Sequence, residues 1–363
     1  MHMADALVSP VVGLSLWAAS GTLLGWSSRQ VRQADQERLV PLMGVLGAFI
    51  FAAQMLNFSI PATGSSGHIG GGLLLAILLG PHPAFVVIAS VLTVQALFFA
   101  DGGLLALGAN IFNLGALPCF IGYLLIYRPL IGANPLAHTP RRVGWAAMLA
   151  AIVGLQLGAL GVVVETLLSG ITSLPASAFL LLMQPIHLAI GLIEGLATAV
   201  VVLFIRRARP DLFSPGESSH AVRTAAAPLS LRPLLLALGA AAALSAGVFS
   251  WFASTQPDGL EWSIEQVSGS ATPPTPASEI HATLTEAQKK IAWLADYKFP
   301  FAAPNQVAAP AERSAPKPGE SGAETIWPAV DANGSLAGLI GAAATLSLVM
   351  SLGYLLQRRR GSP

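Results

Sequence analysis

Residues 143–168 read VGWAAMLAAIVGLQLGALGVVVETLL, a run of 26 residues in which Glu165 is the single charged side chain. An apolar run of about 18 or more residues is long enough to cross the hydrocarbon core of a bilayer as a helix. Comparable runs occur on both sides of it, so the sequence predicts an all-α, polytopic membrane helical bundle. The other apolar segments are 9–27, 39–60, 69–80, 83–99, 103–127, 177–205, 233–253 and 336–356.

The composition agrees with a membrane protein. Of the 363 residues, 54% are hydrophobic and 10% are charged, whereas a soluble domain carries about 25% charged residues. The single cysteine, Cys119, excludes a disulfide framework and a cysteine-based zinc site. No Walker A sequence is present, so this chain does not hydrolyse ATP through a P-loop. Nothing in the sequence predicts a nucleic-acid partner.

The number of spans depends on residues 69–99. The segment 69–80 is short for a span, and Gly80-Pro81-His82-Pro83 favours a break before 83–99. With that break, every arginine cluster falls on one side of the membrane, which the positive-inside rule assigns to the cytoplasm. We therefore predict about seven spans followed by two more, with the N-terminus and the 60–68 loop outside and the C-terminus inside. The clusters are Arg29/Arg32/Arg38, Arg128/Arg141/Arg142, Arg206/Arg207/Arg209 and Arg358/Arg359/Arg360.

The polar stretches divide the chain into two modules. Pro, Ser, Ala and charged residues dominate a long extracytoplasmic segment, which we expect to be weakly ordered over much of its length. Within it, residues 284–294 are suited to an amphipathic helix. The predicted parts are a transmembrane module at 1–206, a cytoplasmic linker at 207–232, a two-span module at 233–356 with its extracytoplasmic segment at 254–335, and a cytoplasmic tail at 357–363.

The first two residues are suited to binding a metal ion. No basic stretch precedes the first apolar run, so we expect the N-terminus not to be cleaved as a signal peptide. The Met1 amine, the His2 amide nitrogen and His2 Nδ1 can chelate one ion through fused rings, an arrangement that suits Ni²⁺, Cu²⁺ and Co²⁺. A fourth nitrogen is available from His68, which lies in a glycine-rich loop on the same predicted side as Met1.

Several polar residues fall inside or beside the predicted spans. They serve either as hydrogen bonds between helices, each contributing about 0.6 kcal/mol, or as functional groups. Gln54 with Asn57, and Asn110 with Asn113, would each share a helical face. We predict that Asp5, Asn57, Asn110 and Asn113 surround the metal ligands.

His187 and Glu194 are two turns apart in one span and form either a packing pair or a functional pair. An intramembrane metal-dependent enzyme that uses His187 and Glu194 is an alternative function, although the sequence offers no clear third ligand for it. A passive metal channel is another alternative.

Three motifs resemble the CbiM/NikM family over residues 1–206. They are Met1-His2-Met3-Ala4-Asp5-Ala6-Leu7, the Gly67-His68 loop, and Ala100-Asp101-Gly102-Gly103-Leu104 followed by Leu107-Gly108-Ala109-Asn110-Ile111-Phe112-Asn113. In the second module, Gln256-Pro257-Asp258-Gly259-Leu260-Glu261 resembles the PDGLE signature of the small CbiN/NikN component.

The resemblance implies a substrate-specificity component of an energy-coupling factor importer in a bacterial or archaeal plasma membrane. It implies a square-planar metal site made by the Met1 amine, the His2 amide nitrogen, the His2 imidazole and the His68 imidazole. It further implies a CbiQ/NikQ-like membrane T component and CbiO/NikO-like cytoplasmic ATPases as partners, and a loading role for the N component. The ion is cargo, so no permanent cofactor is predicted, and the sequence leaves nickel and cobalt both open.

Overall fold

The computed structural model describes the chain except residues 35–37, 133–134, 214–229, 272, 275, 277, 300–327 and 359–363. Most of the predicted linker, the later part of the extracytoplasmic segment and most of the predicted tail therefore lie outside the described residues.

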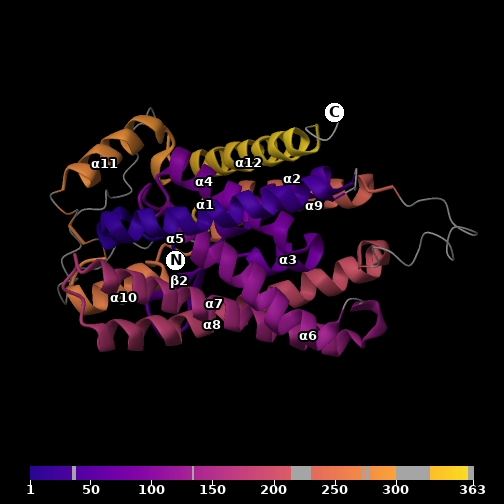
Figure 1. Ribbon diagram of the computed structural model, residues 1–363, viewed down its shortest axis with the longest axis horizontal. Helices are drawn as coiled ribbons and strands as arrows, with labels where there is room; N and C mark the ends of the chain where they lie inside the picture. Colours follow the sequence, from indigo (N-terminus) through magenta and orange to yellow (C-terminus); the bar gives the residue numbers. More distant parts are fainter. Residues whose placement is uncertain are drawn as a thin grey trace, which may run out of the picture.

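Within the described residues, a helix lies over each of the apolar segments (Figure 1), which confirms the predicted all-α membrane bundle. Five of these helices, α4, α5 with η2, α7, α8 and α12, are long and apolar enough to cross a membrane, and α2 and α9 are shorter. The bounds are α1 (Pro10–Gln33), α2 (Leu39–Gln54), α3 (Gly72–Leu79), α4 (Pro81–Phe99), α5 (Leu107–Ile111), the π-helical η2 (Phe112–Tyr127), α7 (Pro140–Ser169), α8 (Ala176–Ala208), α9 (Arg232–Gly247) and α12 (Ala332–Arg358).

The remaining helical elements are short. They are η1 (Asp5–Leu7), α6 (Arg128–Ile131), η3 (Pro135–Ala137), η4 (Pro210–Phe213), η5 (Phe249–Phe252), α10 (Gly259–Ser268), α11 (Glu279–Ile291) and η6 (Ala295–Tyr297).

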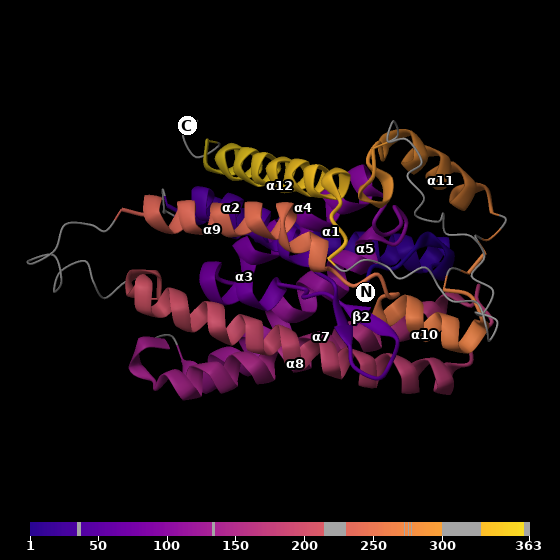
Figure 2. The ribbon, with the colours of Figure 1, turned by 180° about the vertical axis from the view of Figure 1, so that it is seen from behind.

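The helices pack in two groups whose axes run along the long dimension of the molecule (Figures 1 and 2). One group brings α12 and α9 of the second module against α2 of the first, and the other pairs α7 with α8. The chain breaks between α3 and α4 at Gly80, whose φ of +84° suits glycine, and Pro81 begins α4. The short α3 is buried along almost its whole length, which is how a helix too short to span a bilayer is accommodated.

A small β-hairpin interrupts the predicted 39–60 segment. Helix α2 ends at Gln54, and β1 (Phe58–Ile60) pairs antiparallel with β2 (Ser65–Gly67). The prediction that Gln54 and Asn57 share a helical face is wrong, because Asn57 lies beyond the helix end. The turn between the strands uses positive φ at Ala62 and Gly64, and His68 follows directly after β2.

The connection between α9 and α12, residues 248–331, is more structured than the sequence indicates. Its described part contains α10, α11 and η6, so the expectation of weak order is wrong for residues 254–271 and 278–299. The predicted amphipathic helix is confirmed within α11 and ends at Ile291. We call residues 248–331 the α9–α12 connection. Figure 2 shows α10 beside the end of α8 and α11 at the same end of the bundle.

Candidate metal centre

The N-terminal segment is anchored inside one end of the bundle. The Asn110 side chain accepts a hydrogen bond from Met3 N at 2.8 Å and donates one to Met3 O at 3.1 Å. Asp5 Oδ1 accepts a hydrogen bond from Ala106 N at 2.9 Å. Asn110 and Asp5 therefore hold the backbone that carries Met1 and His2.

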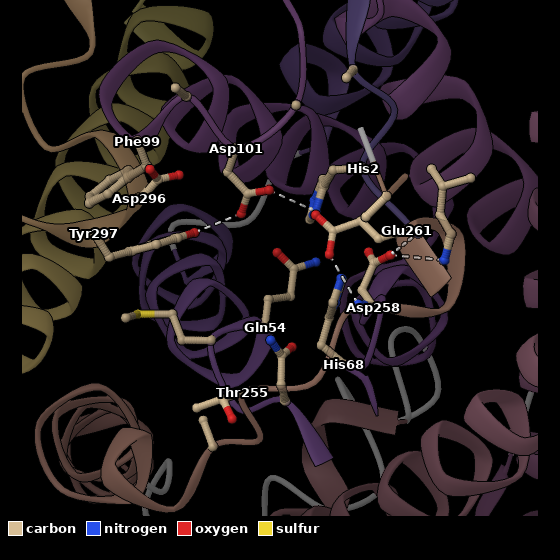
Figure 3. A pocket seen from close by; sticks show the side chains of 18 of the residues that line it. His2, Gln54, His68, Phe99, Asp101, Thr255, Asp258, Glu261, Asp296 and Tyr297 are labelled. Carbon is tan, nitrogen blue, oxygen red and sulfur yellow. Dashed lines mark hydrogen bonds and ion pairs between the residues drawn. The ribbon is translucent and has the colours of Figure 1, made fainter. Parts of the chain in front are cut away.

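The hairpin places His68 beside the first residue of the chain. His68 Nε2 lies 3.4 Å from the Met1 amine, and its Nδ1 lies 3.1 Å from Ile69 O. The contact with a carbonyl oxygen requires the proton on Nδ1, so the Nε2 lone pair faces the amine. The ring centroids of His2 and His68 are 5.1 Å apart (Figure 3). The structure thus brings together the predicted ligands Met1, His2 and His68.

Buried polar side chains fix the loop after His68. Glu194 accepts hydrogen bonds from Gly70 N at 3.0 Å and from Gly71 N at 2.9 Å. Gln54 Nε2 donates to Gly70 O at 2.8 Å, and Gln95 Nε2 donates to Gln54 Oε1 at 2.8 Å. Glu194 in α8, Gln54 in α2 and Gln95 in α4 are all buried, so the position of His68 is set by helix packing.

His2 is held by a residue that the site prediction missed. Its Nδ1 lies 3.2 Å from Asp101 Oδ1, and the Tyr297 hydroxyl donates to Asp101 Oδ2 at 2.8 Å (Figure 3). His2 Nε2 has no hydrogen-bond partner, although the side chain is only 8% exposed. The predicted chelate uses Nδ1, so forming it requires His2 to release Asp101. Asp101 belongs to a motif that resembles the family, but nothing in the sequence indicated its contact with His2.

Asp258 reaches the Met1 amine from the second module. Its Oδ2 lies 2.5 Å from the amine, while Oδ1 accepts hydrogen bonds from Leu260 N and Glu261 N, each at 2.8 Å, and so caps α10. Ser66 N donates to Pro257 O at 2.8 Å, which fastens this turn to β2. The PDGLE resemblance indicated the module but not this contact.

Two more residues of the α9–α12 connection contact backbone carbonyl oxygens of the first module. His281 Nε2 lies 3.1 Å from Asp5 O and 3.0 Å from Val8 O. Gln288 Nε2 donates to Ala96 O at 2.9 Å and to Gly102 O at 2.8 Å. Contacts with backbone carbonyl oxygens leave no sequence signal, since every residue carries such an oxygen.

The other predicted residues lie farther from the ligands. Asn113 Nδ2 donates to Glu165 Oε2 at 2.8 Å, and Asn57 lines a cavity of about 920 Å³ together with His2 and His68. The structure records no bond between His187 and Glu194: His187 Nδ1 lies 2.8 Å from Met183 O, and both Glu194 oxygens accept loop N–H groups.

The electrostatics of the site favour neutral imidazoles. Burial lowers the pKa of His2 and of His68, and the Met1 amine lowers the pKa of His68 further. Burial raises the pKa of the Asp258 carboxyl, but the charge and hydrogen bond of the Met1 amine outweigh burial and bring that pKa below its ordinary value. Neutral His68 can therefore offer its Nε2 lone pair directly, whereas His2, whose Nδ1 donates to Asp101, offers Nδ1 only after its ring proton moves to Nε2.

A metal site at this position would need main-chain nitrogen as well as side chains. In the part of the chain that the structure describes, no group of three or more His, Cys, Asp or Glu side chains is arranged to hold a metal ion. The Met1 amine is a main-chain nitrogen that lies beside His68.

Comparisons with known proteins place the chain among metal transporters. Residues 2–212 match the family described as the cobalt uptake substrate-specific transmembrane region, CbiM, and residues 232–358 match the PDGLE domain. A putative fused nickel transport protein NikMN of Archaeoglobus fulgidus is 37% identical over 238 residues, which are 64% of this chain and 76% of that protein. A cobalt transport protein CbiM of Geobacter sulfurreducens is 29% identical over 249 residues, which are 66% of this chain and 68% of that protein.

A solved structure described as a transition metal transporter has a TM-score of 0.50 with this chain at 29% identity, covering 57% of this chain and 93% of the other. The fold, the membrane-spanning helices and these relatives agree. The chain is a multi-pass membrane protein that belongs to the CbiM family of nickel and cobalt transport proteins and carries a PDGLE domain in its C-terminal part.

Proposed function

We propose that this chain is the substrate-specificity subunit of an energy-coupling factor importer and captures Ni²⁺ or Co²⁺ at the outer face of the membrane. The ligands are the Met1 amine, the His2 amide nitrogen, the His2 imidazole and the His68 imidazole. The observation that carries this proposal is the 3.4 Å approach of the Met1 amine to His68 Nε2, which joins residues 67 positions apart in the sequence.

Metal capture rearranges the contacts of the N-terminus. The Met1 amine gives up its ion pair with Asp258 and loses its proton, and the His2 amide also loses its proton. Both imidazoles are already neutral, so the protons released on binding come from the amine and the amide. Four nitrogens in a plane suit Ni²⁺ and Cu²⁺, and nitrogen ligands also suit Co²⁺.

Partner subunits supply the energy. The chain has no Walker A sequence, so ATP hydrolysis belongs to CbiO/NikO-like ATPases on the cytoplasmic side, coupled through a CbiQ/NikQ-like T component. The positive-inside rule applied to the arginine clusters supports an N-terminus outside and a C-terminus inside, in a bacterial or archaeal plasma membrane. Hydrolysis reorients the loaded module so that the ion is released inward.

The geometry gives less support to the alternatives. A metal-dependent enzyme built on His187 and Glu194 requires a free carboxylate, whereas both Glu194 oxygens are engaged by the loop that carries His68. A passive channel differs from the proposed importer in one measurable respect, since it would move metal in vesicles that lack any ATPase.

The test uses purified protein with its native N-terminus and Ni²⁺, Co²⁺, Cu²⁺ and Zn²⁺ in competition. We expect tight Ni²⁺ binding with the optical spectrum of a planar nitrogen site, and loss of that binding in His68→Ala or when residues are added before Met1. His138→Ala, a change in a loop remote from the centre, serves as the matched control and should bind as the wild type does. Retained tight binding after N-terminal extension would count against the proposed ligand set.

A further inference from the structure

His187 in α8 is a fully buried imidazole with one nitrogen unused. Its Nδ1 lies 2.8 Å from Met183 O, so Nδ1 carries the ring proton and Nε2 keeps its lone pair. Nε2 has no hydrogen-bond partner, and the residue is 0% exposed. A buried acceptor without a partner is rare in folded proteins and points to a function or to a bound species.

His187 lies beside the metal centre. A small cavity of about 10 Å³ is lined by His187 together with Met1, His68, Asp258 and Gly259, among others. In both His68 and His187, Nδ1 contacts a backbone carbonyl oxygen, so the lone pair lies on Nε2; that of His68 faces the Met1 amine at 3.4 Å, and that of His187 has no partner. Neutral imidazole in this tautomer is a common ligand of Ni²⁺ and Co²⁺.

Gly259 of the PDGLE motif packs directly against His187 in this cavity. A Cβ atom added at Gly259 would lie 3.1 Å from His187 Cε1 and 2.9 Å from Ile186 Cγ2. A side chain at this position would therefore displace the imidazole or the turn. The second module reaches His187 through the same turn that brings Asp258 to the Met1 amine.

We propose that His187 is a further metal ligand, whose Nε2 takes the ion from the centre formed by Met1, His2 and His68 on its way into the membrane module. This inference rests on the proposed function. A planar ion bound by four nitrogens is open on both faces, so a fifth nitrogen can bind before any of the four leaves, and the charge of the ion does not change.

A structural water is the other occupant that the cavity permits. The cavity is at the lower limit for one water molecule, which also requires two or more polar partners. The two occupants predict different results for His187→Leu, a change to an apolar side chain of similar size. If the lone pair serves only the metal, removing it eliminates an unpaired buried acceptor, and thermal stability stays the same or rises.

The experiment compares wild type, His187→Leu and His187→Cys in the full complex with its ATPases. The probes are radioactive ⁶³Ni²⁺ uptake at limiting metal and Ni²⁺ affinity of the purified chain. For His187→Leu we expect an affinity within about threefold of wild type, an unchanged or higher Tm, and uptake reduced at least about tenfold. For His187→Cys, whose thiolate can bind the same metals, we expect uptake to recover to within about threefold of wild type. His138→Leu is the matched control.

Two results would overturn the assignment. The first is normal uptake by His187→Leu. The second is a loss of both Tm and uptake in His187→Leu that His187→Cys does not restore, which is the result expected of a structural histidine or a bound water. Failure of the proposed function is separable from these, because it appears as wild-type protein that does not bind Ni²⁺ through His68.

Discussion

The candidate metal centre is held from two sides that differ in construction. On the helical side, Glu194, Gln54 and Gln95 fix the loop after His68 through hydrogen bonds that are buried between α2, α4 and α8. On the side of the α9–α12 connection, Asp258 binds the Met1 amine and Tyr297 binds Asp101, which contacts His2, beside a cavity of about 920 Å³. The loop that carries His68 is therefore fixed mainly by buried hydrogen bonds of the first module, with a backbone hydrogen bond from Ser66 to Pro257, whereas Met1 and His2 are held by residues of both modules.

The largest effect is expected from Glu194→Gln on the helical side. Glutamine presents one carbonyl oxygen and one NH₂ group, so it cannot accept hydrogen bonds from both Gly70 and Gly71. Because partners that orient a ligand typically contribute 10–100-fold to metal affinity, we expect Ni²⁺ affinity to fall by about that factor. Chelator competition measures it, and Glu286→Gln, an exposed change, is the control. Wild-type affinity in Glu194→Gln would show that the hydrogen bonds of Glu194 do not contribute to metal binding.

An intermediate effect is expected from His281→Ala on the side of the connection. The change removes the imidazole contact from both Asp5 O and Val8 O; Asp5 O keeps its hydrogen bond from Val8 N, and the loss at Val8 O costs about 1–3 kcal/mol for a buried acceptor. Residues 1–8 should then open more often, which hydrogen exchange of their amides measures, and Ni²⁺ should dissociate faster. Unchanged exchange at these amides would show that the connection does not restrain the N-terminus. His138→Ala is the matched histidine control.

A smaller effect is expected from Tyr297→Phe. The variant keeps the ring against Phe99, whose centroid is 4.6 Å away, and removes the hydroxyl that donates to Asp101. Loss of one such hydrogen bond costs about 0.5–1.5 kcal/mol, so we expect roughly a two- to tenfold change in Ni²⁺ affinity with little change in fold. Tyr354→Phe, on an exposed face of α12, provides the comparison. Equal Ni²⁺ affinities in the two variants would show that the Tyr297 hydroxyl does not contribute to metal binding.

The last prediction concerns the pH dependence of stability in protein without added metal, and not the affinity for Ni²⁺. Burial lowers the pKa of His2 and His68 below the ordinary value of 6.5, so the folded state takes up protons less readily than the unfolded state. Stability should be level above about pH 7 and should fall as the pH drops below 6.5, by at most about 1.4 kcal/mol per pH unit for each histidine. Thermal unfolding between pH 8 and 5 measures this slope, and His68→Leu should reduce it. If stability varies with pH equally in His68→Leu and in wild type, groups other than His68 cause the pH dependence.

The sequence predicts much of the helical side and little of the connection side. Long apolar runs require helices in a membrane, and Gly80-Pro81 ends one helix and begins the next, so the bundle follows from local chemistry. The chelating geometry of Met1-His2 and the arginine pattern together predict that His68 meets the N-terminus, and the structure joins them.

What the sequence does not predict depends on contacts between distant segments. Asp101, His281 and Tyr297 act on backbone atoms or on single side chains far away in the chain, and neither hydropathy nor spacing records such pairs. Asn57 was misplaced because the apolar run continues past Gln54, while the backbone leaves the helix to form the hairpin.

The ion pair between Met1 and Asp258 joins groups that are 257 residues apart on one polypeptide. In a system made of two separate chains, the occupancy of such a contact would depend on how much of each chain the cell produces. Fusion replaces that dependence with a fixed effective concentration, so each amino terminus has its own carboxylate in a ratio of one to one. The contact also cannot form until ribosomes have synthesised the second module, so the centre matures late in the biogenesis of the protein.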